Sequence, residues 1–205
     1  GATTVGATTL NVTGTTTVVN GNATVAFNSV VFTTSTLTGS VLVKNGSAAT
    51  TNVITVTSST LNGKSSAFTN GAAVQSNTIN LGLTTASTFA GVVAATNGAS
   101  AGLNLIEVQQ GTLTSGGSLV NGTAGTTNTV PIGSVAAVGV TTGNLVITNG
   151  VATTSNNVNV DRLTTGGAKL GDVTINNAGT TATTVAFGAA GANVVGGNLT
   201  VRNQA

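Results

Sequence analysis

The side chains of this chain favour extended backbone almost everywhere. Val, Ile and Thr are abundant and prefer β-strands, whereas the strong helix formers Glu, Lys, Gln, Arg and Met are nearly absent. Charged residues make up only 4% of the chain. A hydrophobic content of 40% can bury a sizeable core, and a net charge of +2 with a single proline argues against disorder. We therefore expect an all-β protein.

Short alternations of apolar and polar residues recur along the chain. In seven of the nine, two apolar side chains flank one small or polar residue, which predicts a short strand with one buried face. These strand cores are 10–12, 25–27, 41–43, 54–56, 79–81, 145–147, 158–160, 173–175 and 199–201. Seven Asn-Gly pairs also occur, and because both residue types tolerate positive φ we interpret the pairs as tight turns.

The last third of the chain has the most regular pattern. Strand cores begin there at a loose but recognisable period, at Leu145, Val158, Val173, Val185 and Leu199. The stretch "GNLVITN" at 143–149 returns as "GNLTVRN" at 197–203. This spacing favours a parallel β-solenoid, in which each turn stacks on the next. An antiparallel β-sandwich is the alternative that the same spacing allows.

No Pro-rich or charged linker interrupts the sequence, so we expect residues 1–205 to form a single β-rich domain. The alternative is a sub-boundary near Pro131. The pattern is less regular from about 70 to 140, where a short helix or a second subdomain could lie. Residues 1–20 alternate small and apolar side chains, and we interpret them as a donor strand or an N-terminal cap.

Residues for catalysis and metal binding are scarce. The chain has no His or Cys, so nucleophiles lack their usual base and metals lack their usual ligands. The carboxylates Glu107, Asp161 and Asp172 are separated, and their spacing selects no pair for acid–base work. Lys64 follows Gly63 but lacks the earlier glycine of a phosphate-binding loop. We predict no enzymatic activity and no cofactor, and we assign no catalytic, cofactor-binding or metal residue.

The few charges also limit the partners. The five basic residues are scattered along the sequence and predict no patch for nucleic acid. No apolar run is long enough for a membrane-spanning helix. A surface with so little charge gives little repulsion between copies. We therefore expect the chain to assemble with copies of itself, and the cell envelope and other surface proteins are further candidate partners.

Two covalent modifications are hypotheses at this point. Glu107 lies in the apolar stretch "LNLIEV", where a buried acid could promote an isopeptide crosslink between Lys and Asn, and the alternative is a Glu that faces solvent. Asn-x-Ser/Thr sites would permit N-glycosylation in a suitable secretion system. These sites are Asn11, Asn22, Asn45, Asn121 and Asn198.

Three stretches, "GATTLNVTGTTTVVNG", "TNVITVTSSTLNG" and "GDVTINNAGTTATTVAFGAAGANVVGGNLTV", resemble Thr/Ala/Gly/Asn-rich bacterial surface proteins. That group includes surface-layer proteins, autotransporter passengers and filamentous adhesins. The resemblance is one of composition over the whole chain. It implies export to the cell surface, a β-solenoid or β-sandwich, and a role in building or decorating that surface. It carries over no functional residue, and the acidic calcium-binding repeats common in surface-layer proteins are absent here.

These observations together predict an extracellular structural subunit that assembles into a filament or surface layer through pairing of strand edges. The alternative function is the stalk or passenger segment of a larger adhesin. An ice-binding module is a third hypothesis, which a regular Thr grid would favour. Pairs of Thr flanking a single residue do recur, but their irregular spacing does not predict one ladder; they lie at 15–17, 34–36, 55–57, 112–114 and 127–129.

Overall fold

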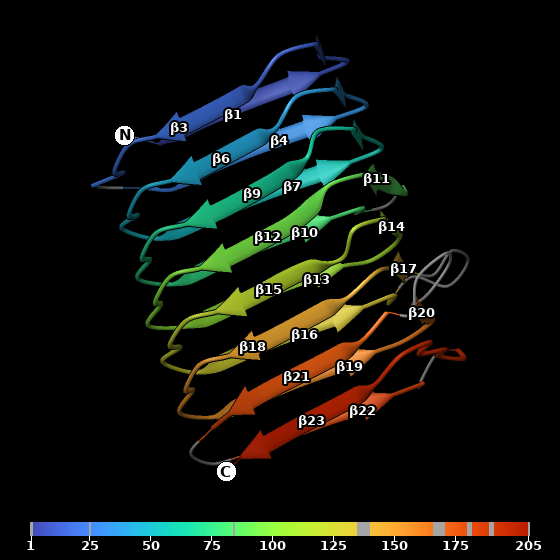
Figure 1. The fold of residues 1–205 in the computed structure, drawn as a ribbon. Coiled ribbons are helices and arrows are strands. Elements are labelled where there is room, and N and C mark those ends of the chain that lie inside the picture. The colour runs from blue at the N-terminus through green and yellow to red at the C-terminus, as the bar shows by residue number, and fades with distance from the viewer. Residues whose placement is uncertain are drawn as a thin grey trace.

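The chain winds into a parallel β-solenoid in the computed structural model (Figure 1). The structure describes residues 2–24, 26–83, 85–134, 140–165, 171–179, 182–188 and 191–204. Each named strand pairs in parallel with the equivalent strand of the next turn. This pairing confirms the solenoid and excludes the antiparallel sandwich.

Three sheets run the length of the solenoid. Sheet A contains β1 (Thr3–Thr8), β4 (Asn28–Thr33), β7 (Thr51–Thr57), β10 (Ser76–Leu81), β13 (Leu103–Val108), β16 (Thr127–Ile132), β19 (Ser155–Val160) and β22 (Thr183–Phe187). Sheet B contains β2 (Asn11–Val12), β5 (Thr36–Leu37), β8 (Thr60–Leu61), β11 (Ser87–Phe89), β14 (Gly111–Leu113), β17 (Val140–Thr142) and β20 (Leu163–Thr165). Sheet C contains β3 (Thr16–Asn20), β6 (Val41–Asn45), β9 (Ser65–Asn70), β12 (Val92–Asn97), β15 (Gly117–Asn121), β18 (Leu145–Asn149), β21 (Val173–Ala178) and β23 (Leu199–Gln204).

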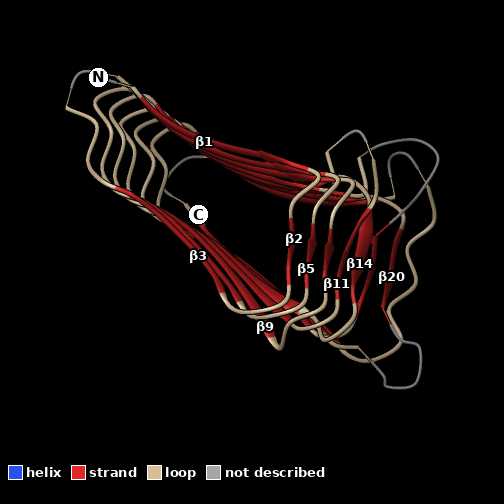
Figure 2. Cartoon of the chain, turned by 90° about the horizontal axis from the view of Figure 1, so that it is seen from above, coloured by secondary structure: helices blue, strands red, loops and turns tan. Residues whose placement is uncertain are grey.

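Each of the first seven turns contributes one strand to every sheet, and the described part of the eighth contributes β22 and β23. Within a turn the chain passes from sheet A to sheet B to sheet C. Loops then join sheet C to sheet A of the next turn along one edge of the solenoid, and the short strands of sheet B close the opposite side (Figure 2).

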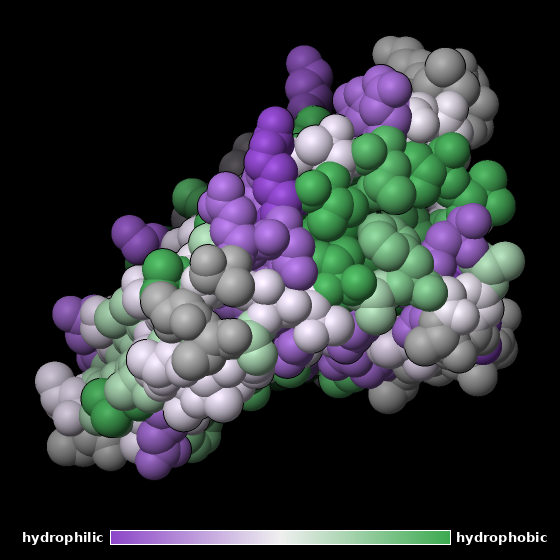
Figure 3. Space-filling model, turned by 90° about the horizontal axis from the view of Figure 1, so that it is seen from below, coloured by the Kyte–Doolittle hydropathy of each residue, from purple (hydrophilic) through white to green (hydrophobic). Residues whose placement is uncertain are grey.

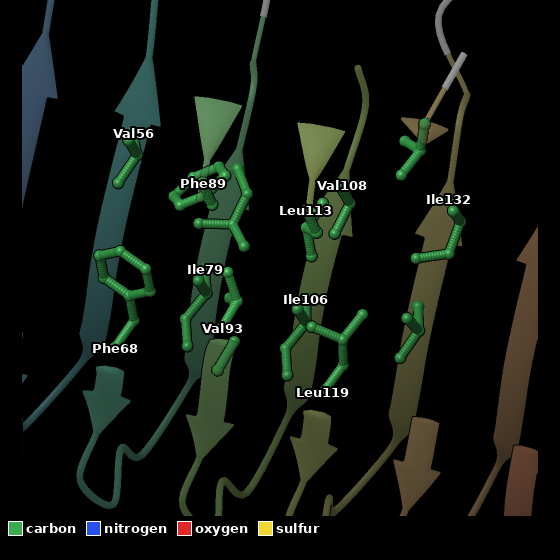
Figure 4. Close-up of a cluster of buried hydrophobic side chains, with 14 of the residues drawn as sticks. Val56, Phe68, Ile79, Phe89, Val93, Ile106, Val108, Leu113, Leu119 and Ile132 are labelled. Carbon is green, nitrogen blue, oxygen red and sulfur yellow. The ribbon is translucent and has the colours of Figure 1, made fainter. Parts of the chain in front are cut away.

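The core lies between the three sheets. Along each strand, alternate side chains are buried, as in β7, where Ile54 and Val56 have no exposed surface and Val53 and Thr55 are half-buried. Successive turns place Val, Ile, Leu and Phe at the inward positions, and these side chains meet in the interior (Figure 4). Phe68 of sheet C and Phe89 of sheet B pack edge to face, with ring centroids 6.1 Å apart. The period-two pattern therefore forms strands because one face of each strand is buried.

Most of the predicted strand cores lie within strands of the structure, including 41–43, 54–56 and 173–175. The core at 25–27 is an exception: Val25 lies outside the described residues, and Ala26 and Phe27 belong to no strand. The expectation of a helix or second subdomain between 70 and 140 is wrong. Strands β10 to β17 continue the same three sheets, and no helix occurs among the residues that the structure describes.

The structure also shows where Pro131 and the N-terminal residues lie. Pro131 lies inside β16, where it faces outward and pairs with Asn159, and sheets A and C continue on both sides of it. Residues 3–20 form the first turn, with β1 on β4 and β3 on β6. They are therefore already paired along one edge within the chain, and the interpretation as a donor strand or N-terminal cap stays a prediction.

Candidate functional site: asparagine columns and open ends

A column of asparagines runs through every turn at the end of the sheet C strands. Each side-chain amide Nδ2 donates to Oδ1 of the asparagine in the following turn, at 2.9 to 3.0 Å. All members before the last are at most 3% exposed. We call this the first asparagine column, and its members are Asn20, Asn45, Asn70, Asn97, Asn121, Asn149, Asn177 and Asn203.

The same amides also bind sheet C to sheet A. Asn45 Nδ2 donates to the backbone carbonyl of Val53, and Asn97 Nδ2 donates to that of Leu105. Equivalent bonds of 2.9 to 3.4 Å occur in the first seven turns. Burying an amide is costly unless its donors and acceptors are satisfied, and this arrangement satisfies them.

A second asparagine column begins the sheet A strands. Its Nδ2 atoms donate to the next Oδ1 at 3.0 to 3.1 Å, from Asn28 through Asn52, Asn77 and Asn104 to Asn128. Asn156 follows in register but donates to the carbonyl of Gly150, and its Oδ1 accepts no hydrogen bond. The second column is therefore complete only in the middle of the solenoid, whereas the first spans all eight turns.

The glycine after each first-column asparagine is required by close stacking. A Cβ on Gly46, Gly71, Gly98, Gly122 or Gly150 would lie 2.7 to 3.0 Å from the carbonyl carbon of the glycine one turn earlier. None of these glycines and none of the column asparagines has a positive φ. The positive φ expected for these Asn-Gly pairs is therefore wrong, although the pairs do begin the loops that lead from sheet C to sheet A.

Alanine or serine two residues after each glycine completes the loop. Ala23, Ala48, Ala73, Ser100, Ala124 and Ala152 form a continuous series of parallel bridges. We call this edge, with its two asparagine columns and the loops between them, the asparagine edge. Its motif Asn-Gly-x-Ala/Ser recurs once per turn, from Asn20 to Ala152.

Both ends of the solenoid expose unpaired strand edges. In parallel sheets, alternate residues direct their N–H and C=O groups to opposite neighbours. The carbonyls of Asn198 and Gln204 accept from β21 and its following Gly179, so Leu199, Val201 and Asn203 direct their backbone groups away from the solenoid. At the other end, Thr16 donates to Ser40, so Thr17 and Val19 direct theirs away.

The last turn also exposes apolar side chains. Phe187 is 40% exposed, Leu199 49% and Val201 41%, although equivalent residues one turn earlier are buried. Seen from below, apolar side chains gather at this end of the molecule (Figure 3). Exposed apolar surface on a strand edge is typical of a surface that pairs with another strand.

The structure corrects the modification hypotheses. The Glu107 side chain lies on the outward face of β13, and Oε1 accepts a hydrogen bond of 3.0 Å from Ser134 Oγ. Lys44 points outward from sheet C, whereas Glu107 points outward from sheet A. These two side chains therefore do not form the buried group that an isopeptide crosslink requires. Asn45 and Asn121 are buried in the first column, which excludes them as glycosylation sites of the folded chain. Asn11, Asn22 and Asn198 are exposed.

A Thr column that the sequence spacing did not predict lies on sheet B. One register position of sheet B holds Thr36, Thr60, Thr88, Thr112, Thr141 and Thr164, and it faces outward in β5, β8, β11, β14 and β20. The Thr pairs considered in the sequence are different residues, apart from Thr36 and Thr112. The column is one residue wide, so it is a single file and not a grid.

Comparison with known proteins identifies no family: no protein-family model, curated protein or solved structure matches the chain. Within the described ranges, the structure holds no helix long and apolar enough to cross a membrane. In the same part of the chain, no three His, Cys, Asp or Glu side chains gather into a group that could hold a metal ion.

Proposed function

We propose that this chain is a structural rod that assembles end to end into an extracellular filament or surface layer. The supporting observation is that the two open ends are complementary. Each internal turn pairs with the next through the same strand edges and the same asparagine column, so the last turn of one copy presents what the first turn of another copy can continue.

The surface composition supports the same function. Only 4% of the residues are charged, so copies repel one another weakly. Hydrogen bonds between strand edges and contacts between apolar side chains would hold the joint, which needs no metal ion. The extracellular location rests on the resemblance in composition to bacterial surface proteins.

A second candidate function is a stalk segment of a longer adhesin. The observation that favours it is the same pair of open edges, because further turns of one polypeptide could cover them as well as a second copy could. The single-file Thr column on sheet B is weaker support for ice binding, since it offers one row of hydroxyls.

The test is assembly of the purified 205-residue chain, followed by light scattering and negative-stain electron microscopy with and without a chelator. We expect ordered filaments or sheets that survive chelation. Val201→Lys should raise the critical concentration about tenfold or more, because it places a charge on the exposed inward side of β23. Val146→Lys is the matched control, since Val146 is 38% exposed but points outward from sheet C. Dispersed monomers at all concentrations would overturn the proposal.

A further inference from the structure

The first asparagine column has a direction. In every step the amide of one turn donates toward the C-terminal end, from Asn20 Nδ2 to Asn45 Oδ1 and finally from Asn177 Nδ2 to Asn203 Oδ1. Asn203 Nδ2 donates to the carbonyl of Thr183 in its own turn. Asn177 Nδ2 makes the equivalent bond to Asn156 and also donates to Thr184 and Asn203 of the following turn. The column therefore presents a donor at its last member and an acceptor, Asn20 Oδ1, at its first.

The sizes of the side chains at the two ends of the solenoid also fit head-to-tail joining of copies. In sheet A, Phe187 is the last member of an inward column whose first member is Ala7. Phe187 is 40% exposed, and Ala7 is a small, half-buried residue at the opposite end. A head-to-tail joint would place the large side chain over the small one, as Ala7 already lies beside Phe32 within the chain.

Glycines in the first turn leave room for a turn stacked above them. A Cβ on Gly39 or Gly46 would lie within 3 Å of the preceding turn, which means that these positions point toward the N-terminal end. The equivalent first-turn residues are Gly14 and Gly21, where an added Cβ meets nothing within 4 Å. No contact inside the described chain requires glycine at these two positions.

From these three observations we propose that the first asparagine column continues from copy to copy and fixes the register of the joint. Asn203 Nδ2 of one copy donates to Asn20 Oδ1 of the next, with Thr200 beside Thr17 and Val201 beside Val18. A slip by one residue would reverse inward and outward faces, and a slip by two toward the start of β3 would set the Asn203 amide against Val18. This inference rests on the proposed function and names its partner as a second copy of this chain.

Cysteine crosslinking tests the register, because the natural chain has no Cys. Thr17 and Thr200 both point outward from sheet C, so the double variant Thr17→Cys with Thr200→Cys should form disulfides between copies. Thr17→Cys with Arg202→Cys is the matched control, since its cysteines are offset by two residues. We expect a ladder of covalent oligomers on a non-reducing gel for the first variant only.

Gly21→Ala supplies a second readout. It should leave the stability of the dispersed chain unchanged and raise the critical concentration about tenfold or more. Gly6→Ala is its control, because Gly6 is equally open but points outward from sheet A. Filaments that form without crosslinks, or that crosslink in the offset variant, would overturn the register and leave the proposed function standing. If the parent chain never assembles, both are overturned.

Discussion

The asparagine edge and the sheet B side of the same solenoid differ in how much the number of residues per turn varies. From the second turn to the sixth, the loop from the first-column asparagine to the second-column asparagine keeps one constant length, as over 45–52 and 149–156. The path from there around sheet B to the next first-column asparagine changes from turn to turn. It is shortest over 28–45 and 104–121, longer over 77–97 and longer again over 128–149. Variation in turn length is therefore absorbed on the sheet B side.

Hydrogen-bond chemistry explains the difference. A buried amide has two donors and an acceptor that are costly to leave unpaired, and between the ends of the first column each has a defined partner. The first loop, 20–28, is one residue longer and still forms both columns, but it has a neighbouring loop on one side only. Sheet B is held by apolar contacts such as those of Leu61, Phe89 and Leu113, and apolar packing accepts several shapes of similar volume. The asparagine edge therefore sets the register, and the sheet B side fills space.

The largest expected effect is loss of a column asparagine. Asn97→Ala would leave Asn121 Oδ1 and the Leu105 carbonyl without their donor. Asn70 Nδ2 would lose one of its two acceptors and keep the carbonyl of Thr78. We expect the free energy of unfolding to fall by about 3 kcal/mol or more, as urea denaturation would measure. Asn62→Ala is the control, because Asn62 also precedes a glycine but is exposed at the junction of sheets B and C. Equal losses in the free energy of unfolding for the two variants would show that the asparagine column has no special part in stability.

The next effect concerns the stacked glycines. Gly71→Ala places a Cβ 2.7 Å from the carbonyl carbon of Gly46, so the turns must separate at the asparagine edge. We expect a loss of about 1 to 3 kcal/mol in the free energy of unfolding. Gly21→Ala occupies the same position in the first turn, where space is open, and should be close to neutral in the dispersed chain. If Gly71→Ala were as stable as Gly21→Ala, close stacking would not explain these glycines.

The sheet B side should tolerate a change of shape in the core. Phe89→Leu introduces the residue type that the neighbouring turns already carry at this position, Leu61 and Leu113. Thermal unfolding should therefore show a loss below about 1.5 kcal/mol. The edge-to-face contact with Phe68 is lost, which accounts for part of that figure. A loss as large as that of Asn97→Ala would show that sheet B is as strictly specified as the asparagine edge.

The sequence predicted the class of fold better than its repeat. Strand cores from 145 onward indicated stacked turns, but the intervals between them are half-turns, because Leu145 and Val173 lie in sheet C and Val158 lies in sheet A. The full turn was visible in six of the seven Asn-Gly pairs, which recur once per turn from Asn20 to Asn149. Turn propensity concealed this signal, since a buried Asn followed by a Gly without positive φ contradicts the usual preference of both residues.

The open ends and the Thr column could not be predicted from spacing alone. Whether a Val or Leu is buried depends on whether another turn covers it, and Leu199 is exposed although Val173, its partner in the preceding turn, is buried. The Thr column recurs at unequal intervals because it lies on the variable side, so no fixed period reveals it. The Thr residues come together only because the strands of successive turns pair in register.

The smallest expected effect on stability is a chemical one at Asn62. Deamidation requires the backbone nitrogen of the following glycine to attack the asparagine Cγ; ammonia leaves, and water then opens the succinimide to Asp or isoAsp. In five column pairs that glycine N–H is held by the asparagine carbonyl of the preceding turn at 2.9 Å, as in Gly98 on Asn70. Asn62 is exposed and lies outside the columns.

We therefore expect mass spectrometry after incubation in mildly alkaline buffer to find deamidation first at Asn62, with the five held pairs following only when the chain is unfolded in urea. The Asn62→Asp variant, which carries the Asp product, should unfold within about 0.5 kcal/mol of the parent chain. Deamidation of Asn97 in the folded chain as fast as that of Asn62 would contradict the protection that stacking gives. Because both residues are followed by glycine, the difference in rate isolates the effect of their place in the solenoid.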